Sequence, residues 1–197
     1  MNFGCQTVQY QIRVTCRLML KRRAPLTYEN ALSRAAALCA KCEQCSPDIL
    51  KKLATWGLSA GDASRVIIRL EELRFLDDSR YARAYAHDKL HFSGWGRRKI
   101  SQGLWAKRLP QEIISEACES LSEEEDEYRA IAVRVIRSKT RQLKEWPLSR
   151  ESKIKLVKYA MGRGFEYPLV ADIVRKDLPG FREENEFSDR DLPDYED

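Results

Sequence analysis

Residues 77–109 read DDSRYARAYAHDKLHFSGWGRRKISQGLWAKRL, and this stretch decides the fold because two helical patterns flank a glycine turn. The first pattern predicts a helix that Asp77 or Asp78 caps. Its expected inward side chains are Tyr81, Ala84 and Tyr85. The second pattern predicts a shorter helix with Ile100 and Leu104 inward. Glycines between them are typical of a helix exit followed by a tight turn.

The same order of three short helices recurs along the chain. Each second helix ends at a glycine or basic pair that precedes an apolar residue: WGL at 56–58, KRL at 107–109 and RGF at 163–165. The apolar residues of these tripeptides are 51 and 56 residues apart, and the polar segment Leu143–Ser152 accounts for the longer spacing. A period of about 50 residues built from three helices indicates a helical repeat protein.

We therefore predict an all-α protein of three tandem three-helix repeats that form an elongated, curved array. The repeats are placed at residues 26–76, 77–122 and 123–176. One such unit buries too little apolar surface to be stable alone, so neighbouring units are expected to stack. A single irregular helical domain, in which the spacing is coincidental, stays as the alternative.

The two ends of the chain do not follow the helical pattern. Residues 8–18 alternate between apolar and polar side chains as a strand does, but no second strand-like segment can pair with them. Residues 1–25 are therefore interpreted as an N-terminal extension that is disordered or, if translation starts at Met19, outside the functional chain. Residues 177–197 contain nine acidic and two basic side chains and are predicted to be a disordered acidic tail.

Charge and hydropathy narrow the class of protein. Residues 1–176 carry 33 basic and 21 acidic side chains, a formal net charge of +12, although the whole chain carries +5. Such a basic body indicates nucleic acid or an acidic protein surface as the partner. No run of 18 apolar residues and no signal-peptide pattern is present, so we expect a cytoplasmic protein without a membrane partner and with reduced cysteines.

Two motifs suggest metal chemistry, but both lack ligands. The run CAKCEQC places thiols at Cys39, Cys42 and Cys45, and no fourth thiolate follows at the required spacing. His87 and His91 have zinc-protease spacing, but aspartate replaces the glutamate base and the chain has only two histidines. We predict a protein that is not an enzyme, with no catalytic residue, metal or cofactor. A metal enzyme stays as an alternative.

The strongest indication of function is a group of basic residues. Arg97, Arg98 and Lys99 fall in the first turn of a predicted helix, where cations oppose the positive end of the helix dipole. A local rule broken without local compensation is where function is expected. Cations with aromatic neighbours suit a phosphate backbone or an acidic groove, and Trp95 is expected to be exposed. The candidate contact residues are Arg80, Arg83, Lys89, Trp95, Arg97, Arg98, Lys99, Lys107 and Arg108.

Residues 75–109 combine an aromatic residue and an acidic pair, Arg-Tyr-Ala, a charged helix end, and a glycine turn followed by basic residues and isoleucine. This combination resembles the signature region of the bacterial RecX regulatory proteins. The resemblance extends over about residues 31–176. The matching positions are Phe75, Asp77, Asp78, Arg80, Tyr81, Ala82, Asp88, Lys89, Gly96, Arg97, Ile100, Leu109 and the tripeptide Arg163-Gly164-Phe165.

The resemblance implies a non-enzymatic regulator built from tandem three-helix repeats. Members of the family lie along the deep groove of the RecA–DNA filament and suppress strand exchange, ATP hydrolysis and coprotease activity in DNA repair and the SOS response. It therefore implies a monomer that binds the RecA filament and contacts single-stranded DNA weakly or through RecA. A stand-alone helical nucleic-acid-binding protein stays as the alternative, and it predicts tight, salt-dependent DNA binding without RecA.

Overall fold

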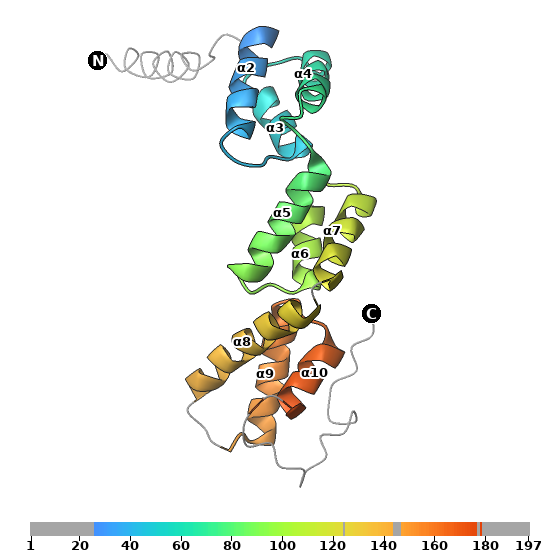
Figure 1. Ribbon diagram of the computed structural model, residues 1–197. Coiled ribbons are helices and arrows are strands. Elements are labelled where there is room, and N and C mark those ends of the chain that lie inside the picture. The colour runs from blue at the N-terminus through green and yellow to red at the C-terminus, as the bar shows by residue number, and fades with distance from the viewer. Residues whose placement is uncertain (1–25, 124, 144–146, 177, 179–197) are drawn as a thin grey trace, which may run out of the picture. The chain divides into compact units, whose positions relative to one another are not determined.

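The computed structural model describes residues 26–123, 125–143, 147–176 and 178 (Figure 1). Within these residues the chain forms helices joined by turns, and no strand. The helices are α2 (Tyr28–Cys39), α3 (Ser46–Thr55), α4 (Ala60–Glu72), α5 (Asp78–His91), α6 (Arg97–Ala106), α7 (Gln111–Glu123), α8 (Glu125–Leu143), α9 (Arg150–Gly162) and α10 (Tyr167–Lys176). The prediction of an all-α fold made of three-helix repeats is confirmed. The predicted N-terminal extension, and the acidic tail apart from Leu178, lie outside the described residues.

The contacts between helices divide the chain into two units. The first contains described residues 26–42 and 48–76, and the second contains residues 43–47 and the described residues from 77 onward. The second and third predicted repeats thus fall in one unit. The predicted boundaries at 76/77 and 122/123 stay predictions, and so does the elongated, curved arrangement. Within the part of the chain that the structure describes, no helix combines the length and apolar character that a membrane crossing requires.

The first repeat is held by a core of small and branched side chains. Thr27 and Ser59 begin α2 and α4, because each hydroxyl accepts a hydrogen bond from a backbone amide of the first helical turn. The side chains of the core are Ala31, Ala35, Ile49, Leu53, Ala63, Val66, Ile67, Leu70 and Leu76.

The second repeat packs α5 against α6 and α7 (Figure 1). Asp77 caps α5 as predicted, since its carboxylate accepts a hydrogen bond from the Arg80 amide at 2.9 Å. The predicted inward face of α5 is wrong by one position. The buried side chains are Ala82, Ala86 and Leu90, because small alanines let α5 approach α7 closely. Tyr81 and Tyr85 lie only partly buried at the edge of this core.

The apolar residues that end the KRL and RGF tripeptides anchor the second and third repeats. Leu109 is 5% exposed and Phe165 is fully buried. Phe165 lies against Tyr128 of α8, with the ring centroids 5.5 Å apart. These anchors belong to one continuous core that joins both repeats.

The second and third repeats meet at the backbones of Gly96 and Gly164, a contact that we call the glycine joint. The Gly96 amide donates to the Arg163 carbonyl at 2.8 Å, and the Arg98 amide donates to the Gly164 carbonyl at 3.2 Å. A Cβ on Gly96 would overlap the backbone of Gly164. Gly164 itself has a φ of 91°, a left-handed conformation that glycine adopts without strain. Both positions therefore require glycine.

The glycine joint also completes the start of α6. This helix has no side-chain cap at Gly96, and its first amides are bonded by the third repeat instead. The Arg97 amide donates to the hydroxyl of Tyr128 at 3.1 Å, beside the two amides already described. Because these donors are satisfied, the start of α6 has no free amides to cradle a phosphate.

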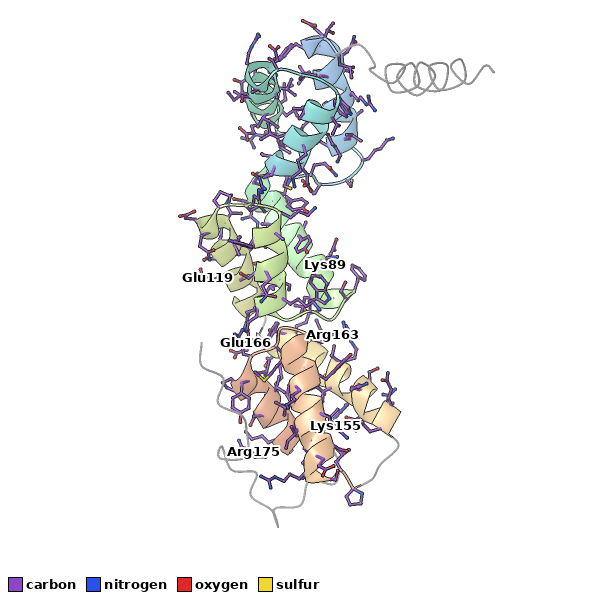
Figure 2. All side chains as sticks on the ribbon, turned by 180° about the vertical axis from the view of Figure 1, so that it is seen from behind. Lys89, Glu119, Lys155, Arg163, Glu166 and Arg175 are labelled. Carbon is purple, nitrogen blue, oxygen red and sulfur yellow. The ribbon has the colours of Figure 1, made fainter. Side chains whose placement is uncertain are left out.

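Side chains of the third repeat also bond backbone carbonyls at the end of α5 and just after it. Arg134 donates to the His91 carbonyl at 3.0 Å, and Arg163 donates to the Ser93 carbonyl at 2.9 Å. Figure 2 shows Arg163 at the end of the third repeat that faces the second. Cationic donors suit the carbonyls at a helix C-terminus. The third repeat therefore supplies donors to α5 and acceptors to α6.

We predict that Gly96→Ala lowers the free energy of unfolding of the second unit by about 2–4 kcal/mol, because the new methyl group must displace backbone. Urea denaturation followed by tryptophan fluorescence measures this change. Gly162→Ala is the matched control. A Cβ there meets nothing within 4 Å and adds helix propensity, so stability stays constant or rises by up to about 1 kcal/mol. Equal stabilities for the two variants would contradict the joint.

Candidate partner-binding site

Two lysines lie over one tryptophan ring at the seam between α5 and α6. The Nζ atoms of Lys89 and Lys99 are 5.1 Å and 4.8 Å from the ring centroid of Trp95. Lys89 Nζ is also 5.3 Å from the ring centroid of Tyr85. We call these four residues the lysine–aromatic cluster. The sequence predicted three of them as contact residues, and the structure brings the three together.

The helices position this cluster through ordinary spacing and one small residue. Tyr85 and Lys89 are one turn apart on α5, and Lys99 lies in the first turn of α6. Gly103 lets the Tyr85 ring rest against α6, since a Cβ there would overlap the phenol oxygen. Burial raises the pKa of Tyr85, while the nearby positive charge of Lys107 acts in the opposite direction. The phenol therefore stays neutral at physiological pH.

The positive charge of the cluster is not neutralised by an acidic side chain. Among the described residues, no carboxylate oxygen lies within 4.0 Å of Nζ of Lys89 or Lys99. The ring face attracts each ammonium group, but two like charges close to one ring repel each other. An anionic group of a partner close to either ammonium would offset this repulsion. The cluster therefore suits a phosphate or a carboxylate of a partner.

The prediction that Trp95 is exposed is wrong. Trp95 is partly buried against the core, and the two lysines lie over its ring. The exposed aromatic side chains of this region are Phe92, at 83%, and Trp105, at 72%. The flanking glycines of Trp95 gave a misleading signal, because they serve the turn and the glycine joint.

Arg97 is engaged inside the protein. Its Nη2 donates to the Leu121 carbonyl at 3.2 Å, Nη1 lies 3.7 Å from Glu166, and the guanidinium carbon lies 4.0 Å from the ring centroid of Tyr128. Its Nε is buried without a hydrogen-bond partner in the described residues. The side chain is only 25% exposed. We therefore remove Arg97 from the candidate contact residues.

Tyr128 and Glu166 complete this internal network. The Tyr128 hydroxyl donates to Glu166 Oε2 at 2.8 Å, and Figure 2 shows Glu166 near Arg163 at the joint. Burial raises the pKa of Tyr128 well above its ordinary value, so the phenol keeps the proton that it donates. Sequence reasoning missed both residues. The available signal was a helix start with three cations and no side-chain cap.

Two other predicted residues are paired with acids. Arg80 Nε donates to Glu43 at 2.7 Å, and Arg83 Nη1 donates to Glu116 at 2.6 Å. All four side chains are at least about one-third exposed, so these pairs add little stability. They do neutralise the local charge. Arg80 and Arg83 are therefore weaker candidates than the lysines of the cluster.

The remaining predicted residues lie elsewhere on the second repeat. Arg98 and Arg108 are exposed, and neither guanidinium has an acidic partner among the described residues. Arg108 ends the α6–α7 turn with a φ of 64°. Lys107 acts on Tyr85 and thus lies near the lysine–aromatic cluster. Arg98 lies on the flank of α6 that faces α7.

The metal-like motifs do not converge in the structure. The rings of His87 and His91 stack with centroids 4.1 Å apart, and His91 Nδ1 lies 3.5 Å from Glu127. Cys45 is buried in the core of the second unit, whereas Cys42 is exposed. Throughout the described ranges, no three His, Cys, Asp or Glu side chains come together in a way that would hold a metal ion.

Comparison with known proteins places the cluster in a defined domain. Residues 77–117 match the family model for the second three-helix domain of RecX. The chain is 30% identical over 136 residues to a regulatory protein RecX of Thermus thermophilus, covering 69% of this chain and 84% of that protein. It is 28% identical over 157 residues to a regulatory protein RecX of Clostridium acetobutylicum, covering 76% and 69%. The chain covers only 58–61% of the length of three further relatives.

Solved structures with a similar fold are also RecX proteins. The crystal structure of RecX from Lactobacillus salivarius superposes with a TM-score of 0.67 at 17% sequence identity, covering 76% of this chain and 95% of that one. At this low identity the likeness concerns the fold alone. It agrees with the three-helix repeats.

We predict that Arg97→Ala lowers the free energy of unfolding of the second unit by about 2 kcal/mol, because it removes a charged hydrogen bond and leaves Glu166 without its cation. Arg98→Ala, one residue away but exposed, changes stability by less than about 0.5 kcal/mol. Thermal and urea unfolding of the two variants, side by side, measure the difference. A stable Arg97→Ala protein would return Arg97 to the candidate contact residues.

Proposed function

The chain belongs to the RecX family of regulatory proteins, and from this premise we propose that it binds the RecA–DNA filament and restrains its activities. The restrained activities are strand exchange, ATP hydrolysis and coprotease activity, in DNA repair and the SOS response. In this proposal the protein is a cytoplasmic monomer that acts by binding rather than by catalysis. The observation that carries the proposal is the lysine–aromatic cluster within the matched domain.

The chemistry of the cluster supports an anionic partner surface. Lys89 and Lys99 present two charges that no described carboxylate neutralises, on side chains that Trp95 holds in place. Ordering long lysine side chains beforehand lowers the entropy that binding must remove. A DNA phosphate and an acidic group of RecA both pair favourably with a lysine ammonium. A RecA–DNA filament offers both kinds of group.

The glycine joint supports the same proposal. Three of its residues lie on α5 and on the first turn of α6, and Trp95 lies in the turn between them. The end of α5 and the start of α6 are both bonded to the third repeat. A binding surface on rigidly held helices is positioned more accurately than one on loops. The third repeat therefore acts as a support for the contact surface of the second.

Charge reversal of the cluster tests the proposal. Single-stranded-DNA-dependent ATP hydrolysis by the RecA of the same organism is measured while this protein is titrated. We predict that Lys89→Glu/Lys99→Glu raises the concentration for half-inhibition by about 10- to 100-fold, because attraction to the filament becomes repulsion. Circular dichroism checks that the variant is folded.

Lys155→Glu/Lys158→Glu is the matched control, since it makes the same change in charge on exposed side chains of α9. Figure 2 shows Lys155 on α9, well away from Lys89. The control is expected to inhibit within about twofold of the unchanged protein, because a distant surface charge has a small, screened effect. Equal losses in both variants would mean that only net charge matters. No inhibition by the unchanged protein at any ratio would overturn the proposed function.

A further inference from the structure

A shallow groove runs between α6 and α7, on the flank of α6 that faces away from the lysine–aromatic cluster. Its volume is about 380 Å³. Six of its eight lining residues are Arg, Ser or Gln, and none is acidic. The polar side chains include Ser101 and Gln102 from α6 and Gln111 and Ser115 from α7. The groove therefore combines hydrogen-bond donors and acceptors with an apolar floor that includes Ile114 and Cys118.

An exposed aromatic side chain extends this groove along α6. Arg98, Ser101 and Trp105 recur at spacings of three and four residues, so they lie along one flank of the helix. The Trp105 side chain is 72% exposed, although indole is among the most strongly buried groups in proteins on average. Nothing in the packing of the second repeat explains this exposure. Arg108 follows in the turn after α6, where its φ is 64°.

These residues fit a single strand of nucleic acid. Exposed indole stacks on nucleobases, arginine binds phosphate, and serine and glutamine bond the edges of unpaired bases. A partner helix would need a continuous apolar stripe, and of the eight residues that line the groove only Ile114 and Cys118 are neither Arg, Ser nor Gln. The basic balance of residues 1–176, +12, favours the same partner.

We propose that Trp105, Arg98 and the α6–α7 groove form a binding site for single-stranded DNA. One base stacks on Trp105, the adjacent phosphate pairs with Arg98, and the groove takes the edge of a neighbouring base. The site rests on the proposed function in that the strand is the DNA of the filament. It differs from the lysine–aromatic cluster in residues and flank. Side chains must hold the phosphate, because the third repeat occupies the amides at the start of α6.

The test measures binding of a fluorescein-labelled oligo(dT) by the full chain, through fluorescence anisotropy and without RecA. Trp105→Ala is expected to weaken binding by about 5- to 100-fold through loss of base stacking, and Trp105→Phe to retain most of it. Arg98→Ala is expected to reduce the slope of log affinity against log salt by about 0.7–1, because one phosphate contact is lost. Phe92→Ala, which removes an aromatic side chain that is 83% exposed, is the control and keeps the affinity of the unchanged protein.

Three results would overturn this site. One is oligo(dT) binding by Trp105→Ala that equals that of the unchanged protein. Another is an equal loss in Trp105→Ala and Phe92→Ala. The third is a Trp105→Ala protein that binds oligo(dT) as the unchanged protein does but binds DNA-free RecA more weakly. That result would make the surface a protein-docking site. Because the oligonucleotide test contains no RecA, its failure is distinct from a failure to inhibit RecA.

Discussion

The contact between the backbones of Gly96 and Gly164 is the constraint on which the second unit depends. It brings the carbonyls of the α9–α10 turn to the amides that begin α6, so this helix starts without a side-chain cap. The same approach brings Arg97 over Tyr128 and beside Glu166. Three cations at a helix start are tolerated there because one of them is paired internally and the amides are already bonded. The unfavourable placement of cations at the positive end of the α6 dipole is thus explained by contacts within the protein, without a partner.

The joint leaves α6 with two different outward flanks. One flank carries Lys99 over the Trp95 ring, which Lys89 of α5 also contacts. The other carries Arg98 and the polar groove toward α7. Both flanks belong to a helix whose start is fixed by the third repeat. A single short helix therefore presents two basic surfaces in a constant relation, as the proposed binding to a filament of protein and DNA requires.

The helical repeat was predictable because it depends on local spacing. Apolar residues at helical intervals and the WGL, KRL and RGF tripeptides are visible in the sequence, and they predicted the all-α fold and the three-helix repeats. The candidate site was predictable only in part. Lys89 and Lys99 were identified from charge, but the role of Arg97 depends on Tyr128 and Glu166, which lie in another repeat. The burial of Trp95 depends on how the turn between α5 and α6 packs, and the exposure of Trp105 on which flank of α6 meets a neighbour. Spacing alone determines neither.

Hydrogen exchange of the amides of Gly96, Arg97 and Arg98 tests the glycine joint most directly. These amides begin a helix, where exchange is ordinarily fast because no preceding turn supplies acceptors. If the third repeat bonds them, they exchange as slowly as core amides such as those of Ile100 and Leu156, through opening of the whole second unit. Exchange as fast as that of the first-turn amides of α9 would contradict the joint, and with it the fixed position of both basic surfaces.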